Sequence, residues 1–379
     1  MTKSVSRAGV VRGKGPQPRA RTGKWRKTNG AKSSVAAFAD KRPRRNQRNR
    51  LLGVLAALLT LVGLVSVLVR LLPADLQALP WLPDLVALTP WFLIPSVLAL
   101  ILALRAKRWF VALVAILCLS VQVYWQYPFF SAGQCLPQEA MEAVSQAKAN
   151  HSDAYARVMT FNVYKGRADA KAIVALVREQ RVEVLALQET TRPFIDRLEA
   201  AGIEDYLPYS QVSSADGRYG NGLWSATEMT KPADDDVDSR ASLMPGGTIR
   251  FKEGQVSIRF VSVHTTSPSP GQWEAWRQSL DDLARLTSRT DRRYILMGDF
   301  NASNDHAPFR SVLADRFQDA ALQSGHGLTL SWPADRVGVP AFAAIDHLIL
   351  DRGITAGQLE MVRIAGSDHK ALLGTIAVD

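Results

Sequence analysis

The sequence MGDFNAS at residues 297–303 follows an apolar run that begins at Tyr294, and it places Asp299 and Asn301 behind Gly298. Residues two apart on a strand face the same side, so these two polar side chains can meet where the strand ends. Gly, Asp and Asn are also ordinary turn formers, so a plain turn explains this stretch equally well when it is taken alone. The rest of the chain decides between a turn and a functional site.

Short strand-like runs alternate with helical patterns from Arg157 onward. This alternation predicts a layered α/β domain of about 220 residues, which is large enough for a full hydrophobic core. The strand-like runs lie at 158–163, 182–187, 256–264, 293–299, 345–350 and 372–378, and the helical patterns at 170–180, 191–202 and 273–289.

Polar side chains recur at the ends of these predicted strands. Each has an ordinary explanation by itself, because Asn162 can satisfy a backbone group, Glu189 can cap a helix, and a histidine can be a hydrogen-bonded core residue. Their shared position favours one polar site instead. Carboxylate and amide oxygens without a cysteine cluster favour a hard cation, Mg²⁺ or Mn²⁺, over zinc. The residues are Asn162, Gln188, Glu189, His264, Asp299, Asn301, Asp346, His347, Asp368 and His369.

The chain has 379 residues and a formal net charge of +11, but the charge is unevenly distributed. Residues 1–50 carry +15, residues 51–126 carry +2, and residues 127–379 carry −6. A domain that binds many phosphates of a polyanion usually has a positive surface of its own. The acidic balance of the C-terminal segment therefore makes nucleic acid a less favoured partner.

The first 50 residues have almost no periodic apolar residues, which predicts a disordered basic arm. Such an arm can bind anionic lipid headgroups in the cytoplasm, or alternatively RNA or DNA there. Three apolar segments follow, and their lengths predict transmembrane helices. The alternative, two buried helices after a signal peptide, is disfavoured because no small-residue cleavage site follows the first segment. The predicted spans are residues 51–72, with the single charge Arg70 near its end, 86–104 and 109–130.

The basic arm and the short sequence RAKR at 105–108 flank these spans on one side, whereas the loop with Asp75 and Asp84 is acidic. By the positive-inside rule the N-terminus is cytoplasmic, and three spans would place the C-terminal domain outside the cell membrane. Residues 131–155 read as a linker with a short amphipathic helix. A disulfide between Cys118 and Cys135 is not expected, because Cys118 falls inside the third span.

Several motifs occur in an order that resembles the endonuclease/exonuclease/phosphatase superfamily, which has the deoxyribonuclease-I-like fold. The resemblance covers residues 156–379 and implies a four-layer αββα sandwich with the site at one mouth of the packed sheets. Three spans before such a domain also resemble a membrane-bound actinobacterial subgroup, the VanJ-like proteins associated with glycopeptide antibiotic resistance. The motifs are TFNVYKG (160–166), LALQE (185–189), GNGLWSA (220–226), SVHTTSP (262–268), MGDFNAS (297–303), AIDHLIL (344–350) and GSDHKALL (366–373).

The resemblance implies a metal site and a role for each of its residues. Glu189 would be the principal ligand of Mg²⁺, or of Mn²⁺, with Asn162 and Asp368 beside it, and the cation would polarise a phosphoryl oxygen.

The catalytic residues implied by the resemblance are His264, Asp299, Asn301, Asp346 and His369. Asp299 would accept the proton of a water that Asn301 helps to place. Asp346 would hold His369, whose imidazolium would stabilise the phosphoryl oxygens. His264 would contact the phosphate or protonate the departing oxygen.

The superfamily cleaves DNA, RNA, inositol phosphates and phosphorylated lipids, so the fold does not choose the substrate. An acidic domain tethered close to the outer leaflet suits a lipid-linked phosphate or diphosphate, such as an undecaprenyl diphosphate-type carrier of the cell envelope. The alternatives are an extracytoplasmic metal-dependent nuclease and a catalytically inactive membrane receptor.

Overall fold

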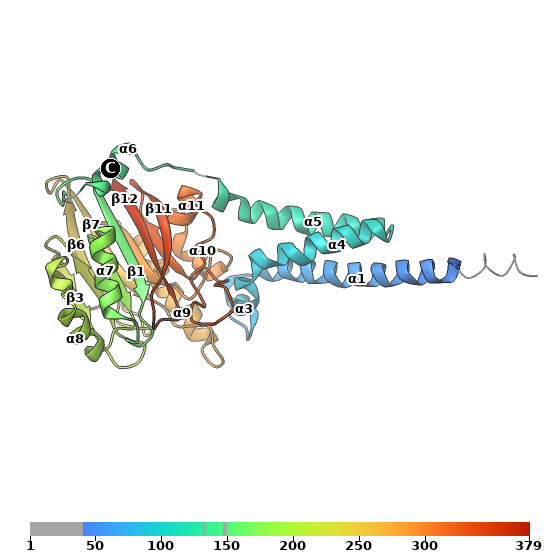
Figure 1. Cartoon of the computed structure of the whole chain (residues 1–379), viewed down its shortest axis with the longest axis horizontal. Helices are drawn as coiled ribbons and strands as arrows, with labels where there is room; N and C mark the ends of the chain where they lie inside the picture. Colours follow the sequence, from blue (N-terminus) through green and yellow to red (C-terminus); the bar gives the residue numbers. More distant parts are fainter. Residues whose placement is uncertain (1–40, 132, 147–149) are drawn as a thin grey trace, which may run out of the picture. The chain divides into compact units, whose positions relative to one another are not determined.

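The computed structural model describes residues 41–131, 133–146 and 150–379 (Figure 1). Most of the predicted disordered arm lies outside the described residues. Its last part, residues 41–50, is helical, because α1 (Lys41–Arg70) begins there. Lys and Arg are good helix formers, and they extend the apolar helix that follows them.

The predicted second span is shorter in the structure than the first and third. Among the described residues, only Asn46–Arg70 and Trp109–Phe130 are long and apolar enough to cross a membrane. The segment expected to span at 86–104 divides into the end of α3 (Leu82–Ala87), the 3-10 helix η1 (Thr89–Phe92) and α4 (Leu93–Arg105). Pro90 and Pro95 explain the interruption, because proline cannot donate a backbone hydrogen bond inside a helix. The 13 residues of α4 reach about 20 Å, and with η1 they form the apolar helical segment Thr89–Arg105, which is shorter than the two membrane-length helices.

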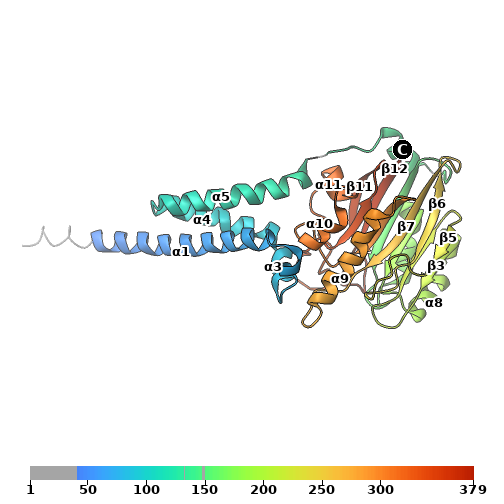
Figure 2. The same cartoon turned by 180° about the vertical axis from the view of Figure 1, so that it is seen from behind.

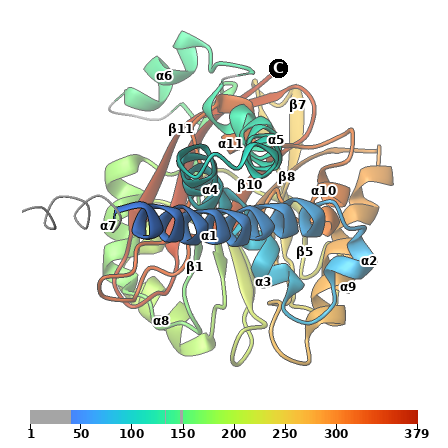
Figure 3. The same cartoon turned by 90° about the vertical axis from the view of Figure 1, so that its right-hand side faces the viewer.

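The remaining N-terminal elements complete this region. Residues 106–108 join α4 to α5 (Trp109–Gln126), and the two helices pack side by side (Figure 3). The other elements are α2 (Ala74–Gln77), η2 (Tyr127–Phe130) and α6 (Gln138–Ser145). Cys118 and Cys135 are free, as expected.

Two six-stranded sheets form the C-terminal part of the chain (Figure 2). The first has the order β11-β12-β1-β2-β4-β3, and the second has the order β5-β6-β7-β8-β10-β9. The first sheet comprises β1 (Tyr155–Asn162), β2 (Val184–Gln188), β3 (Tyr209–Ser213), β4 (Asn221–Ser225), β11 (Ile354–Arg363) and β12 (Lys370–Val378). The second comprises β5 (Thr230–Ala233), β6 (Gly246–Phe251), β7 (Val256–His264), β8 (Arg293–Asp299), β9 (Gln318–Asp319) and β10 (Asp346–Leu350).

Alternating apolar side chains explain how each strand packs on both faces. In β1, Val158 belongs to the core between the sheets, whereas Met159 belongs to the core under the outer helices. In β8, Met297 and Leu296 divide in the same way. This period of two is the pattern of strands that are buried on both faces. The predicted α/β fold is therefore confirmed as a pair of facing sheets.

Helices cover the outer face of each sheet. The first sheet packs against α7 (Ala170–Gln180) and α8 (Arg192–Ala200), and the second packs against α9 (Trp273–Ala284) and α10 (Ala307–Leu313). The short elements η3 (Ile203–Asp205), η4 (Arg285–Ser288) and α11 (Ala320–Ser324) complete the domain.

The register of the strands brings the polar strand ends together. Asn162 pairs with Gln188 across the parallel strands β1 and β2, and His264 pairs with Asp299 across β7 and β8. Asp346 pairs with Asp299 across the antiparallel strands β8 and β10. Gly298 permits this close approach, because a Cβ there would lie 1.9 Å from the carbonyl oxygen of Val263.

Candidate active site

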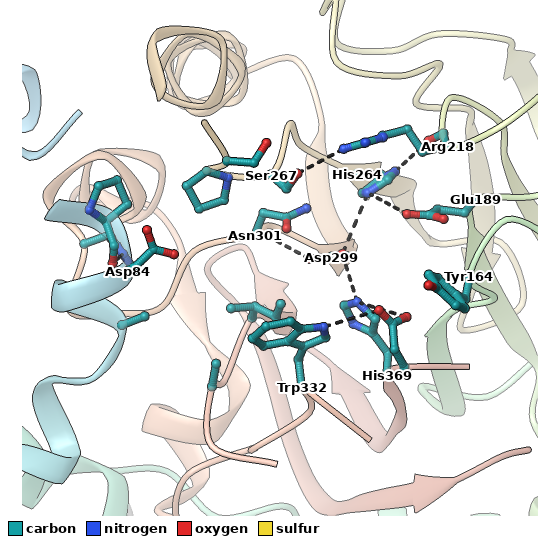
Figure 4. Close-up of a pocket in the computed structure, with 18 of the residues that line it drawn as sticks. Asp84, Tyr164, Glu189, Arg218, His264, Ser267, Asp299, Asn301, Trp332 and His369 are labelled. Carbon is teal, nitrogen blue, oxygen red and sulfur yellow. Dashed lines mark hydrogen bonds and ion pairs between the residues drawn. The ribbon is translucent and has the colours of Figure 1, made fainter. Parts of the chain in front are cut away.

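The eight residues predicted for the site converge at one edge of the paired sheets (Figure 4). A cavity of about 360 Å³ lies there. Asn162 and Asp346 are buried immediately behind the side chains that line it, with exposures of 1% and 0%. The predicted residues on the cavity wall are Glu189, His264, Asp299, Asn301, Asp368 and His369.

Glu189 is held by a backbone hydrogen bond from the loop after β1 and by its own backbone conformation. Its Oε2 accepts a hydrogen bond of 2.8 Å from the backbone N–H of Lys165, and its own φ of 59° lies in the left-handed region. A non-glycine residue rarely adopts this conformation, and such strain clusters at functional sites. Burial raises the pKa of Glu189, and the nearby negative charge of Asp368 adds to the increase.

Asp299 lies at the centre of the polar cluster. Its Oδ2 accepts a hydrogen bond of 3.0 Å from Asn162 Nδ2 and lies 3.7 Å from His264 Nε2 and 3.6 Å from His369 Nε2. Its Oδ1 accepts the backbone N–H of Asn301 at 2.8 Å. Burial raises the pKa of this carboxyl, against the opposing charge of His369. A carboxylate with a raised pKa beside a cavity is suited to accept a proton.

His369 is held by a buried carboxylate. Its Nδ1 donates to Asp346 Oδ2 at 2.8 Å, so Nε2 faces Asp299 and the cavity. Burial alone would lower the pKa of His369, but the charges of Asp346 and Asp299 outweigh it and raise the pKa to about 10. These carboxylates therefore favour the imidazolium form of the ring, and such a group stabilises developing negative charge.

His264 has the opposite electrostatic environment. Burial lowers its pKa, and its Nδ1 donates to the backbone carbonyl of Arg218 at 3.0 Å. The neutral ring therefore carries its proton on Nδ1. Its Nε2 points toward Glu189 and Asp299, at 3.8 Å and 3.7 Å.

Asn301 is positioned as a polar side chain beside this cluster. Its Nδ2 donates to the carbonyl of Thr265 at 3.0 Å, and its φ of 45° is left-handed. MGDFNAS therefore does form a turn, and the same turn directs the polar side chains of Asp299 and Asn301 toward the cavity.

The donor set fits a divalent cation. Glu189 and Asp368 are two acidic side chains in one partly buried cavity, and Asp368 Oδ1 is buried without a hydrogen-bond partner among the described residues. Asn162 fits less simply, because its Nδ2 faces both Glu189 and Asp299 while its Oδ1 accepts the N–H of Tyr164. The side-chain amide of Asn162 would have to rotate so that Oδ1, in place of Nδ2, faced a cation.

A second group of potential ligand atoms lies beside these residues. Single donor atoms of Asp299, Asp346 and His369 all fall within 4.8 Å of one another. His369 Nδ1 and Asp346 Oδ2 already satisfy each other, so this group is better explained as a hydrogen-bonded cluster than as a metal site. We therefore retain Glu189, Asp368 and Asn162 as the expected ligands.

Some residues of the cavity wall were not identified from the sequence. Lys165 lies within the motif TFNVYKG and could have been found there, whereas Arg218, Trp332, His306 and Asp84 carry no local signal. Trp332 Nε1 donates to Asp368 Oδ2 at 3.4 Å, and Arg218 Nη1 donates to Ser267 Oγ at 3.0 Å. Only the folded chain brings these residues to the cavity.

Comparison with solved structures gives several distant matches. A humanized form of D. rerio TDP2 is 15% identical, with coverage of 60% of this chain and 100% of that chain and a TM-score of 0.49. The endonuclease/exonuclease/phosphatase from Bacteroides vulgatus is 16% identical, with coverage of 59% and 99% and a TM-score of 0.46. A family protein from Leptotrichia buccalis is 15% identical, with the same coverage and TM-score. No curated protein matches the chain.

The family model described as "Endonuclease/Exonuclease/phosphatase family" matches residues 159–369, which is more than half of the chain. The match runs from β1 to His369 and so includes every residue of the cluster described above. The chain belongs to the endonuclease/exonuclease/phosphatase family of metal-dependent phosphoester hydrolases.

Proposed function

We propose that this protein is a membrane-anchored, Mg²⁺-dependent phosphohydrolase of the VanJ-like kind. It acts outside the cytoplasmic membrane on a lipid-linked phosphate or diphosphate of the cell envelope, of the undecaprenyl diphosphate type. The observation that carries the proposal is the attachment of residues 300–306, which follow β8 and which we call the catalytic loop, to both membrane-length helices. Arg70, at the end of α1, lies 2.6 Å from Asp305, and Gln126 of α5 donates to the same carboxylate at 3.4 Å.

This attachment places the ends of α1 and α5 next to the residues that follow MGDFNAS. Asp305 comes four residues after Asn301, so the helix ends and the catalytic cluster share one short segment of chain. A phosphate group carried by a membrane lipid would be presented beside these helix ends. A free, long polyanion would gain nothing from such an arrangement.

The arrangement of the helices supports the proposed topology. At the ends remote from Asp305, Gly53 of α1 lies against Arg108, since a Cβ at Gly53 would be 2.8 Å from Arg108 Nε. The basic residues 105–108 therefore lie at the opposite end of the helices from the catalytic loop. Between α1 and α5, the shorter apolar helical segment Thr89–Arg105 returns the chain from the catalytic domain to the end at Gly53, so the chain passes three times between these two ends. With the positive-inside rule, this supports a cytoplasmic N-terminus and an extracytoplasmic catalytic domain.

The chemistry assigns each residue one task. Mg²⁺, held by Glu189 and Asp368 with Asn162, would polarise the phosphoryl group. Asp299 accepts the proton of the attacking water, which Asn301 helps to place. The three further residues of the cluster, His264, Asp346 and His369, bind the negative charge or hold the group that binds it.

His369 and His264 serve the phosphoryl oxygens from two sides. Asp346 fixes His369 so that its Nε2–H faces the cavity. The Arg218 carbonyl keeps one proton on Nδ1 of His264, so a proton on its Nε2 requires the imidazolium form. A bound phosphate favours that form, which would let His264 protonate the departing oxygen.

The alternative is an extracytoplasmic nuclease acting on DNA or RNA. Lys165 and Arg218 favour it, because both line the cavity and could bind a second phosphate of a nucleic acid. The acidic balance of residues 127–379 opposes it.

Phosphate release by the full chain in detergent tests the proposal. We expect Mg²⁺-dependent release from a polyprenyl diphosphate or phosphatidic acid at a rate well above the cleavage of plasmid or 5′-phosphorylated single-stranded DNA. Plasmid nicking at low enzyme, lost in Asp299→Ala, together with no release from either lipid, would establish the nuclease instead. Protease shaving of whole cells that left the catalytic domain intact would overturn the proposed topology.

A further inference from the structure

The segment between the first two apolar helices forms part of the active-site cavity. We call residues 73–92 the connector; it contains α2, α3 and η1. Three of its residues, Pro83, Asp84 and Ala87, line the same cavity as Glu189 and His369. Figure 4 shows Asp84 on its helix, on the far side of the cavity from Asp299 and Glu189.

Hydrogen bonds from both ends of the connector hold it against the catalytic domain. Gln77 is fully buried, and its Oε1 accepts the backbone N–H of Ala307 at 2.7 Å. His306 Nε2 donates to the carbonyl of Pro83 at 2.9 Å, and Trp91 Nε1 donates to the carbonyl of Phe342 at 2.8 Å. The connector is therefore a fixed wall of the cavity rather than a loose loop near it.

The connector wall differs chemically from the catalytic wall. Pro83 and Ala87 present apolar surface, and they face a cavity whose other lining includes the apolar side chains of Trp332 and Ile345. The chain then continues into α4, which exposes large apolar side chains such as Ile94, 58% exposed. The connector thus joins the cavity wall to α4, which packs against the membrane-length helix α5.

Asp84 is the one ionisable residue that the connector contributes to this cavity within the described residues. It is exposed, and desolvation raises its pKa although a backbone hydrogen bond opposes the shift. At neutral pH its carboxylate adds negative charge opposite the catalytic residues. That charge repels phosphates that continue along the connector wall beyond a terminal phosphate or diphosphate, as those of a nucleic acid strand would.

We infer that the connector is the substrate-selecting wall of the site. Pro83 and Ala87 accept the first carbons of an apolar chain that carries a terminal phosphate or diphosphate, and Asp84 excludes polyanions. This inference deepens the proposed function and rests on it. The cavity of about 360 Å³ accommodates a phosphorylated head and a short length of chain, in keeping with the small end of ligand pockets.

Two variants test the two parts of the wall. Asp84→Lys replaces the repelling charge, and we expect kcat/KM for 5′-phosphorylated single-stranded DNA to rise about tenfold relative to that for phosphatidic acid in micelles. Ala87→Trp fills the apolar surface, and we expect the ratio of kcat/KM for phosphatidic acid over para-nitrophenyl phosphate to fall about tenfold. The matched control is Asp75→Lys, because Asp75 lies on the connector but outside the cavity and is 82% exposed. We expect it to leave both ratios unchanged.

The outcomes separate this inference from the proposed function. If the parent protein hydrolyses phosphatidic acid but Asp84→Lys and Asp75→Lys give the same ratios, the inference is wrong and the proposed function stands. If the parent protein cleaves DNA but hydrolyses neither phosphatidic acid nor a polyprenyl diphosphate, the inference and the proposed function are both wrong. Because Asp84 is exposed, its variant decides the matter even where Ala87→Trp does not fold.

Discussion

His306 Nε2 donates a hydrogen bond of 2.9 Å to the carbonyl of Pro83, which joins the segment after the catalytic turn to the connector. The other ring nitrogen, Nδ1, accepts the backbone N–H of Ser303 at 2.9 Å. Both nitrogens are thus used by the neutral ring. A proton on Nδ1 would break the bond from Ser303, and burial accordingly lowers the pKa of His306 to about 4.

The first prediction is a loss of stability in mild acid. The unfolded chain takes up a proton at this histidine below pH 6.5, whereas the folded chain does so only near pH 4. The free energy of unfolding should therefore fall by about 3 kcal/mol as the pH drops through this interval, with no further loss below it from this group. In His306→Gln this part of the pH dependence should vanish in denaturant titrations, whereas the exposed control His326→Gln should keep it. If the free energy of unfolding depended on pH in the same way in both variants, His306 would not be the source of this loss of stability.

The second prediction concerns the ion pair between Arg70 and Asp305. Both side chains are largely buried, 12% and 5% exposed. Arg70→Met leaves the Asp305 charge buried without its main partner, so we expect a loss of about 3 to 5 kcal/mol in the free energy of unfolding. Arg192→Ala breaks an exposed pair with Asp196 and should cost at most about 1 kcal/mol. Adding Asp305→Asn to Arg70→Met should recover part of the loss; equal costs for the Arg70 and Arg192 variants would argue against the attachment.

The third prediction addresses the orientation of His369. Asp346→Asn removes the charge that favours the imidazolium, and its amide can present N–H to Nδ1 in place of an acceptor. We expect kcat for phosphate release to fall by roughly 10² to 10⁴, with KM nearly unchanged. Thermal unfolding of the same variant reports whether the fold persists. A kcat within a factor of about three of the parent would show that Asp346 does not act through His369.

The strands whose ends bear the site residues were predicted better from the sequence than the strands at the sheet edges. The runs at 158–163, 256–264 and 293–299 became β1, β7 and β8 because their long apolar patterns leave few alternatives. The edge strands β5 and β3 were not predicted, because they are short and mostly exposed and so lack a clear alternation.

The cluster itself was accessible from the sequence because each member stands at or beside a strand terminus. Parallel strands such as β1 and β2, and antiparallel strands such as β8 and β10, bring those termini to one edge. The place of the connector in the cavity wall could not be predicted from the sequence. Residues 86–88 read as the start of a membrane span by hydropathy, and nothing local indicates that Asp84 faces a cavity whose catalytic residues lie between Glu189 and His369. Arg70 was read as a charge near a helix end, and its partner Asp305 lies 235 positions away.

The fourth prediction is stabilisation by divalent cations. Mg²⁺ bound to the folded state alone should raise the free energy of unfolding by about 2.7 kcal/mol at 100 times its Kd, and EDTA should reverse the effect. Asp368→Asn should lose this response, whereas Asp335→Asn, an exposed residue nearby, should retain it. Stabilisation of the Asp368 variant equal to that of the parent would place the cation elsewhere.

The central claim is that Glu189 holds the cation on which hydrolysis depends. The most direct measurement is the rate of phosphate release by Glu189→Gln in saturating Mg²⁺, compared with the parent and with Glu199→Gln, a side chain 43% exposed on α8. We expect the Glu189 variant to lose at least about 10²-fold in kcat while it unfolds at a temperature close to that of the parent. The Glu199 variant should match the parent. A Glu189→Gln protein that released phosphate at the parental rate would contradict the account.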